Sequence, residues 1–131
     1  MKYRLVLFDV DSTLINQEVI DLLAARTPHA NKVASITSRA MAGEIDFDAA
    51  LQERVSLLEG LPDSVFSSVL DEISFAQGAE RLLSSLHQSQ YFVGVVSGGF
   101  TNVLGTLFAE FHLKVLHIHG MHYAMFCMGL Y

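Results

Sequence analysis

Two short apolar runs constrain the fold of this chain more than any other feature. Residues 3–10 read YRLVLFDV and residues 91–97 read YFVGVVS, and both are β-rich with almost uninterrupted apolar character. Runs of this kind are typical of strands that are buried on both faces of a parallel sheet. A parallel pair needs a long crossover connection, so the sequence predicts an α/β fold with helices between these two strands.

The remainder of the chain carries helical periodicity, interrupted by capping residues, glycines and prolines. The predicted helices cover residues 16–27, 31–43, 47–60, 62–73, 78–89 and 100–112. A single crossover needs only about a dozen residues, which is far fewer than the chain supplies here. We therefore expect residues 14–75 to form an inserted helical cap, and residues 1–13 and 76–113 to form an α/β core.

Polar residues follow both predicted strands. Asp9 and Asp11 end the first, and Ser97-Gly98-Gly99 ends the second. Alternation along a strand places the two aspartates on one side, where their carboxylates repel each other unless a cation lies between them. A hydroxyl, two glycines and a helix N-terminus form a plausible anion cradle. Taken alone, the aspartate pair is better explained by solvated acids and the glycine motif equally well by a turn, but together they predict phosphoryl transfer through an aspartate nucleophile with Mg²⁺.

Composition narrows the partners. The net charge is −6 and the eight basic residues are scattered, which argues against nucleic acid binding. The single cysteine, Cys127, excludes an internal disulfide and suits a reducing compartment. No segment is long and apolar enough to span a bilayer, and the apolar N-terminal run is too short for a signal peptide. We expect a soluble cytoplasmic protein that binds neither membranes nor nucleic acid.

The motifs resemble those of a known family. DVDST, residues 9–13, followed later by SGG, resembles the haloacid-dehalogenase-like phosphohydrolases. The series GEIDF, ERVSLL and VVSGGF is similar to the phosphoserine phosphatases of that superfamily, and the resemblance runs from Tyr3 to about His112. It implies a Rossmann-like parallel sheet with a helical cap, Mg²⁺ as cofactor, and hydrolysis of O-phospho-L-serine to L-serine and phosphate, the last step of serine biosynthesis.

The resemblance also implies roles for the residues at the strand ends. Asp9 would be the nucleophile that becomes an aspartyl-phosphate. Asp11 would protonate the leaving serine oxygen and then deprotonate the attacking water. Asp9 and the backbone carbonyl of Asp11 would bind Mg²⁺, while Ser97 and the Gly98 N–H would hold the phosphoryl oxygens.

Four further residues are implied to bind the substrate. Glu18 would meet its amino group and Arg54 its carboxylate, a role that suits a guanidinium. Met41 and Phe47 would line the cap over the substrate. Without the resemblance, Glu18 reads as a solvated residue of a first helical turn, and Met41 and Phe47 read as apolar core of the cap.

The final residues depart from the family. No Asp or Glu follows Glu110, and Lys114 is the only lysine after Ser97, whereas the family carries a later lysine and a third carboxylate. We expect residues 114–131 to be a non-family tail, the sheet to be incomplete, and hydrolysis to be impaired by truncation. The incomplete sheet would expose an apolar edge, which would contact a complementing fragment or a second copy of the chain.

Other functions stay open. One is a phosphatase of the same superfamily that acts on another small phosphomonoester. Another is a non-catalytic truncated product, with a tail read from a shifted frame. A third is a module that binds a soft metal through the His, Met and Cys side chains of the tail. The residues concerned are His112, His117, His119, Met121, His122, Met125, Cys127 and Met128.

Overall fold

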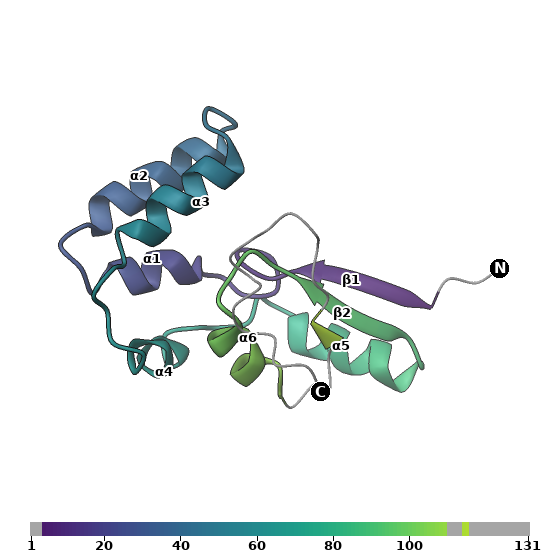
Figure 1. Ribbon diagram of the computed structural model, residues 1–131. Helices are drawn as coiled ribbons and strands as arrows, with labels where there is room; N and C mark the ends of the chain where they lie inside the picture. The colour runs from purple at the N-terminus through teal and green to yellow at the C-terminus, as the bar shows by residue number, and fades with distance from the viewer. Residues whose placement is uncertain (1–3, 110–113, 116–131) are drawn as a thin grey trace. The chain divides into compact units, whose positions relative to one another are not determined.

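The structure, a computed structural model, describes residues 4–109 and 114–115 and has an α/β fold (Figure 1). Its elements, in chain order, are β1 Leu5–Asp9, α1 Val19–Ala24, α2 Ala30–Met41, α3 Phe47–Ser56, α4 Val65–Leu70, α5 Ala79–Gln88, β2 Phe92–Val96, α6 Thr101–Leu107 and β3 Lys114–Val115. The chain divides into two compact units. The helical unit is Glu18–Glu72, and the sheet unit comprises the described residues before and after it.

The sheet unit is built on a parallel sheet with the strand order β1-β2-β3. The register of β1 on β2 runs from Leu5 beside Phe92 to Asp9 beside Val96. This confirms the predicted parallel arrangement of the two apolar runs. Because Asp9 and Val96 are register partners at the carboxyl ends of their strands, the residues that follow both strands emerge at the same edge of the sheet.

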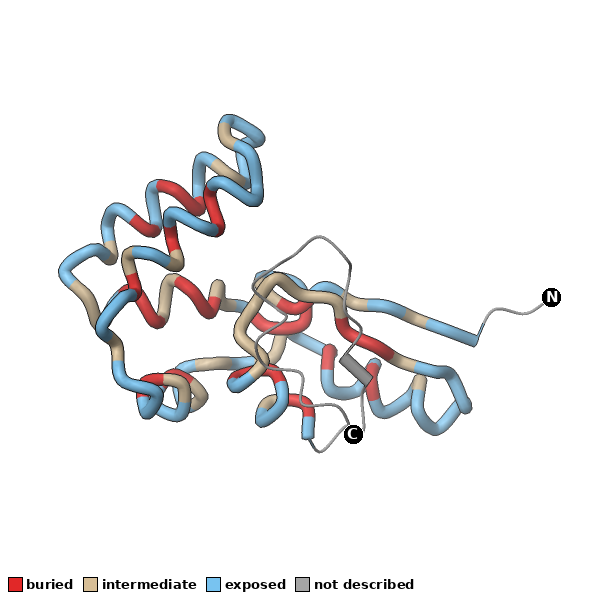
Figure 2. Tube along the Cα trace, viewed as in Figure 1, coloured by how far each residue is buried: buried red, intermediate tan, exposed pale blue. Residues whose placement is uncertain are grey.

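The expectation that β1 is buried on both faces is wrong. Leu5 and Leu7 are 54% and 48% exposed, and Phe92, the register partner of Leu5, is 70% exposed. Figure 2 shows exposed and intermediate residues along this strand. An apolar run indicates that a strand is able to be buried, but whether the strand is buried depends on which elements cover its faces. In the described part of the chain, β1 is an edge strand with one open face.

The core of the sheet unit is made of fully buried side chains from the turn after β1, from β2 and from the helices α5 and α6. They include Val10, Ile15, Leu83, Val95, Val103 and Leu104.

The segments that leave and re-enter the sheet unit pair with each other. Ile15 and Phe75 form an antiparallel bridge, and the N–H of Asn16 donates to the carbonyl of Ser74 over 3.0 Å. The Gln17 side chain accepts from the Ser74 N–H and donates to the Ser74 hydroxyl, each over 3.0 Å. The predicted helix over residues 16–27 is therefore wrong at its start: Asn16 and Gln17 are not helical, and α1 begins only at Val19.

The helical unit holds α1 to α4. Its buried side chains include Val19, Leu23, Val33, Ile36, Leu51 and Val69. The helix α3 is capped by Asp46, a residue type that favours this position, because its carboxylate accepts a hydrogen bond from the Ala49 N–H over 3.1 Å.

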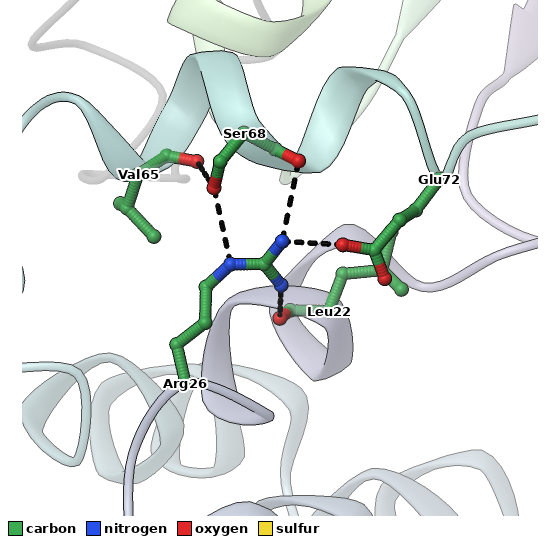
Figure 3. A network of polar contacts seen from close by, with 5 residues as sticks. All are labelled: Leu22, Arg26, Val65, Ser68 and Glu72. Atoms are coloured by element: carbon green, nitrogen blue, oxygen red, sulfur yellow. Dashed lines mark hydrogen bonds and ion pairs between the residues drawn. The ribbon is translucent and has the colours of Figure 1, made fainter.

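Arg26 joins α1 to α4 (Figure 3). Its Nε donates to the Ser68 hydroxyl over 3.1 Å, its Nη2 donates to the Ser68 carbonyl over 3.2 Å, and Nη2 also forms an ion pair with Glu72. Its Nη1 donates to the Leu22 carbonyl of α1 over 2.6 Å. The guanidinium therefore binds both helices at once.

None of the helices in the described part of the chain is long and apolar enough to cross a membrane.

Candidate active site

The first half of the site is the tight turn that follows β1. The N–H groups of Thr13, Leu14 and Ile15 all donate to the Val10 carbonyl over 3.0–3.1 Å. Val10 is fully buried, so it anchors the turn in the core of the sheet unit. The Thr13 hydroxyl donates to Asp9 Oδ2 over 2.9 Å. Asp9, at the end of β1, is thus oriented by a side chain of its own turn.

The second half of the site is the turn after β2. The Ser97 hydroxyl donates to Asp11 Oδ2 over 3.2 Å, and the Gly99 N–H donates to the Ser97 hydroxyl oxygen over 2.9 Å. A Cβ atom on Gly99 would lie 2.9 Å from Ser97 Oγ and 3.2 Å from Asp11 Oδ2. Only glycine fits this close approach without displacing one of the two side chains.

The structure therefore brings Asp11 and Ser97 into direct contact, and Asp9 lies two residues before Asp11 in the chain. Gly98 follows Ser97 in the same turn. The Gly99 N–H, which fixes the Ser97 hydroxyl, was not singled out in the sequence. The available signal was the second glycine of the SGG motif.

The donors gathered here are carboxylate and hydroxyl oxygens, the ligand type that Mg²⁺ prefers. Mg²⁺ is usually held by one or two carboxylates, with substrate phosphate and water completing the shell. The Asp9 carboxylate and the Asp11 backbone carbonyl, the two ligands that the resemblance implies, fit that requirement. In the described residues, no three His, Cys, Asp or Glu side chains gather as a metal-binding group.

Arg54 lies in the helical unit, where it is buried in α3 with only 5% of its surface exposed. Its Nε donates to the Ala50 carbonyl over 3.3 Å, and its Nη1 donates to the Thr37 hydroxyl over 3.1 Å. The Thr37 hydroxyl in turn donates to Asp21 Oδ1 over 3.0 Å. No sequence pattern predicts these contacts, because they join three helices through residues far apart in the sequence.

The other predicted substrate-binding residues also lie in the helical unit. Glu18 is the N-cap residue of α1 and is half-buried. Met41 ends α2 and Phe47 begins α3, and they are 69% and 45% exposed. Neither residue is therefore part of the core of this unit, and the interpretation of Met41 and Phe47 as apolar core of the cap is wrong.

A sequence model of haloacid dehalogenase-like hydrolases matches residues 3–123. This chain belongs to the haloacid dehalogenase-like hydrolase family. The match confirms the resemblance seen in the motifs, and it extends beyond His112, where we expected the likeness to end.

The proposed soft-metal ligands of the tail lie outside the described residues.

Curated members of the family that resemble this chain include phosphoserine phosphatases. That of Streptococcus thermophilus is 50% identical over 106 residues, which are 81% of this chain and 49% of the relative. That of Lactococcus lactis is 49% identical over 100 residues, which are 76% of this chain and 46% of the relative. The chain thus spans about half the length of these curated relatives.

Solved structures of the family confirm the α/β fold. A substrate-bound phosphoserine phosphatase complex superposes with a TM-score of 0.83 at 36% identity, covering 89% of this chain and 56% of that one. A phospho-aspartyl intermediate analogue of phosphoserine phosphatase superposes with a TM-score of 0.82 at the same identity and coverage.

Proposed function

We propose that this chain carries the nucleophile and phosphate-binding residues of a phosphoserine phosphatase, which hydrolyses O-phospho-L-serine to L-serine and phosphate. The observation that carries this proposal is the hydrogen bond from Ser97 to Asp11, which joins the two strand ends that bear the chemistry. Identity of about half to phosphoserine phosphatases supports the choice of substrate.

In the proposed reaction, a carboxylate oxygen of Asp9 attacks phosphorus, and the bond from phosphorus to the serine oxygen breaks. Asp11 gives its proton to the departing serine oxygen. Asp11 then takes a proton from water, and that water attacks phosphorus and releases phosphate from Asp9. The Thr13 hydroxyl orients the Asp9 carboxylate for the first step.

The main obstacle to this reaction is electrostatic. A carboxylate about 4 Å from a phosphate experiences about 4 kcal/mol of repulsion per unit charge pair at an effective dielectric constant near 20. Bound Mg²⁺, held by Asp9 and Asp11, would offset that charge. Ser97 and the Gly98 N–H would receive the phosphoryl oxygens.

The helical unit supplies the proposed specificity and serves as the cap. Arg54 binds the substrate carboxylate and Glu18 binds the amino group, while Met41 and Phe47 exclude water. The buried position of Arg54 supports this role, because a cation shielded from water binds an anion more strongly. The amino acid substrate and the single cysteine favour a cytoplasmic setting.

We further propose that this chain turns over more slowly than the curated relatives. Among the described residues, no third acidic, His or Cys side chain joins Asp9 and Asp11 in a metal-binding group. The open, apolar face of β1 also favours association with a complementing fragment or a second copy.

A second candidate is a phosphatase for another small phosphomonoester. It is favoured by the hydrogen bonds that Arg54 already makes to Ala50 and Thr37, which would leave the residue a purely structural role.

Two substrates and one variant separate the candidates. O-phospho-L-serine and O-phosphoethanolamine share the phosphate and the amine, but only the first has a carboxylate. With Mg²⁺ present, we expect faster phosphate release from O-phospho-L-serine, and we expect Arg54→Gln to abolish that preference. Equal release from both substrates, unchanged by Arg54→Gln, would support the second candidate. Release that does not depend on Mg²⁺ would contradict both.

A further inference from the structure

We propose that Thr37 is a positioning residue for Arg54, which it holds ready to bind the carboxylate of the substrate. This inference rests on the function proposed above and adds a residue to it. Thr37 lies in α2, is 5% exposed, and belongs to none of the motifs that identify the family. Its hydroxyl both accepts and donates a hydrogen bond: it accepts from Arg54 Nη1 over 3.1 Å and donates to Asp21 Oδ1 over 3.0 Å.

These contacts fix the plane of the guanidinium at two points. Nε is held by the Ala50 carbonyl one turn earlier in α3, and Nη1 is held by Thr37 from α2. A guanidinium has more N–H groups than these two bonds use, and those of Nη2 are not used by either bond. The group is thus immobilised while part of its hydrogen-bonding fork remains for a ligand, which lowers the entropy cost of binding.

The partner of Arg54 is a neutral hydroxyl and not a carboxylate, which leaves the charge of the guanidinium available to a ligand. Within the described part of the chain, Arg54 makes no ion pair, whereas Arg26, Lys32 and Arg39 each pair with a glutamate. Thr37 stands between Arg54 and the Asp21 carboxylate, so the acid helps to orient the arginine through the hydroxyl. A direct ion pair would occupy the fork and neutralise its charge. A buried cation without an anion is costly, and this cost favours an anionic ligand.

Variants of Thr37 test the inference. Thr37→Val removes the hydroxyl at nearly constant volume, and Thr37→Ser keeps it. Ser38→Val makes a comparable change at the next, exposed position of α2 and is the matched control. Affinities for O-phospho-L-serine and O-phosphoethanolamine are measured by NMR titration in an Asp9→Asn background, so that the readout does not require turnover.

We expect Thr37→Val to weaken binding of O-phospho-L-serine about tenfold, as loss of one charge-assisted hydrogen bond implies. Binding of O-phosphoethanolamine should not change, Thr37→Ser should restore the affinity, and Ser38→Val should have no effect. A second readout needs no ligand. The guanidinium N–H signals of Arg54 should exchange slowly with solvent in the wild-type chain and in Thr37→Ser, and rapidly in Thr37→Val.

The outcomes separate this inference from the proposed function. The Asp9→Asn chain with Thr37 unchanged should prefer the carboxylate-bearing ligand. If it does and Thr37→Val leaves that preference intact, the inference is overturned and the proposed function stands. If Thr37→Val weakens both ligands equally, Thr37 only packs α2 against α3, and the inference is again overturned. If there is no preference for the carboxylate, the substrate assignment fails and the inference fails with it.

Discussion

The Ser97 hydroxyl donates a hydrogen bond to Asp11 Oδ2 over 3.2 Å, although 86 positions separate the two residues in the sequence. The contact follows from the parallel register that sets Asp9 beside Val96 at the ends of β1 and β2. Ser97 directly follows Val96, and Asp11 lies two residues after Asp9, so both emerge at the same edge of the sheet. The contact places the proposed acid and base of the reaction against the proposed phosphate-binding hydroxyl.

Gly99→Ala should reduce phosphate release by about tenfold or more, because the new Cβ would lie 2.9 Å from Ser97 Oγ and force the Ser97–Asp11 pair apart. The free energy of unfolding should change far less than the activity. The matched control is Gly105→Ala in α6, where a Cβ meets nothing within 4 Å. That control should keep its activity and gain up to about 1 kcal/mol of stability, as expected for alanine in a helix. Equal activity in the two variants would contradict the proposed role of this turn.

Much of this arrangement could be predicted from the sequence. The apolar runs gave the strands, and the residues directly after them gave Asp9, Asp11 and Ser97. The incomplete sheet predicted an exposed apolar edge, whereas the burial of β1 on both faces that its apolar run predicted was wrong, because the exposure of Leu5 and Leu7 depends on which elements cover the sheet. Local pattern fixes where a strand can form, whereas its neighbours fix how far it is buried.

The supporting contacts were equally out of reach. The start of α1 was misplaced because Asn16 and Gln17 satisfy their hydrogen bonds with Ser74, a residue more than fifty positions later. The link from Arg54 through Thr37 to Asp21 is likewise a contact between helices. No periodicity encodes such pairings, so they become visible only once the helices are packed.

Arg26→Ala should destabilise the helical unit by about 1–2 kcal/mol, because one guanidinium binds Leu22, Ser68 and Glu72 together. The loss should appear as faster amide hydrogen exchange in α1 and α4, with little change in α5 of the sheet unit. Lys32→Ala is the control. Lys32 forms a single exposed ion pair with Glu53, with the two side chains 57% and 49% exposed, and such pairs contribute little. A similar effect from both variants would show that Arg26 is an ordinary surface residue.

Leu7→Lys should reduce self-association of the chain, measured by light scattering over a range of concentrations. Leu7 is 48% exposed on the edge strand β1, where a lysine discourages strand pairing and apolar contact. The free energy of unfolding should change by no more than about 0.5 kcal/mol, as for other exposed positions. Leu82→Lys, at a comparably exposed leucine of α5, should leave the self-association unchanged. An equal decrease in both variants would mean that added charge, and not the face of β1, controls association.

The most direct test of the proposed chemistry is to locate the phosphoryl group on the protein. The chain is incubated with Mg²⁺ and O-phospho-L-serine, quenched in acid and mapped by peptide mass spectrometry. We predict one phosphoryl group on Asp9, and its absence when Mg²⁺ is chelated or when the chain carries Asp9→Asn. Phosphoryl transfer to another residue, or Mg²⁺-dependent phosphate release that persists in Asp9→Asn, would contradict the proposal that Asp9 is the nucleophile.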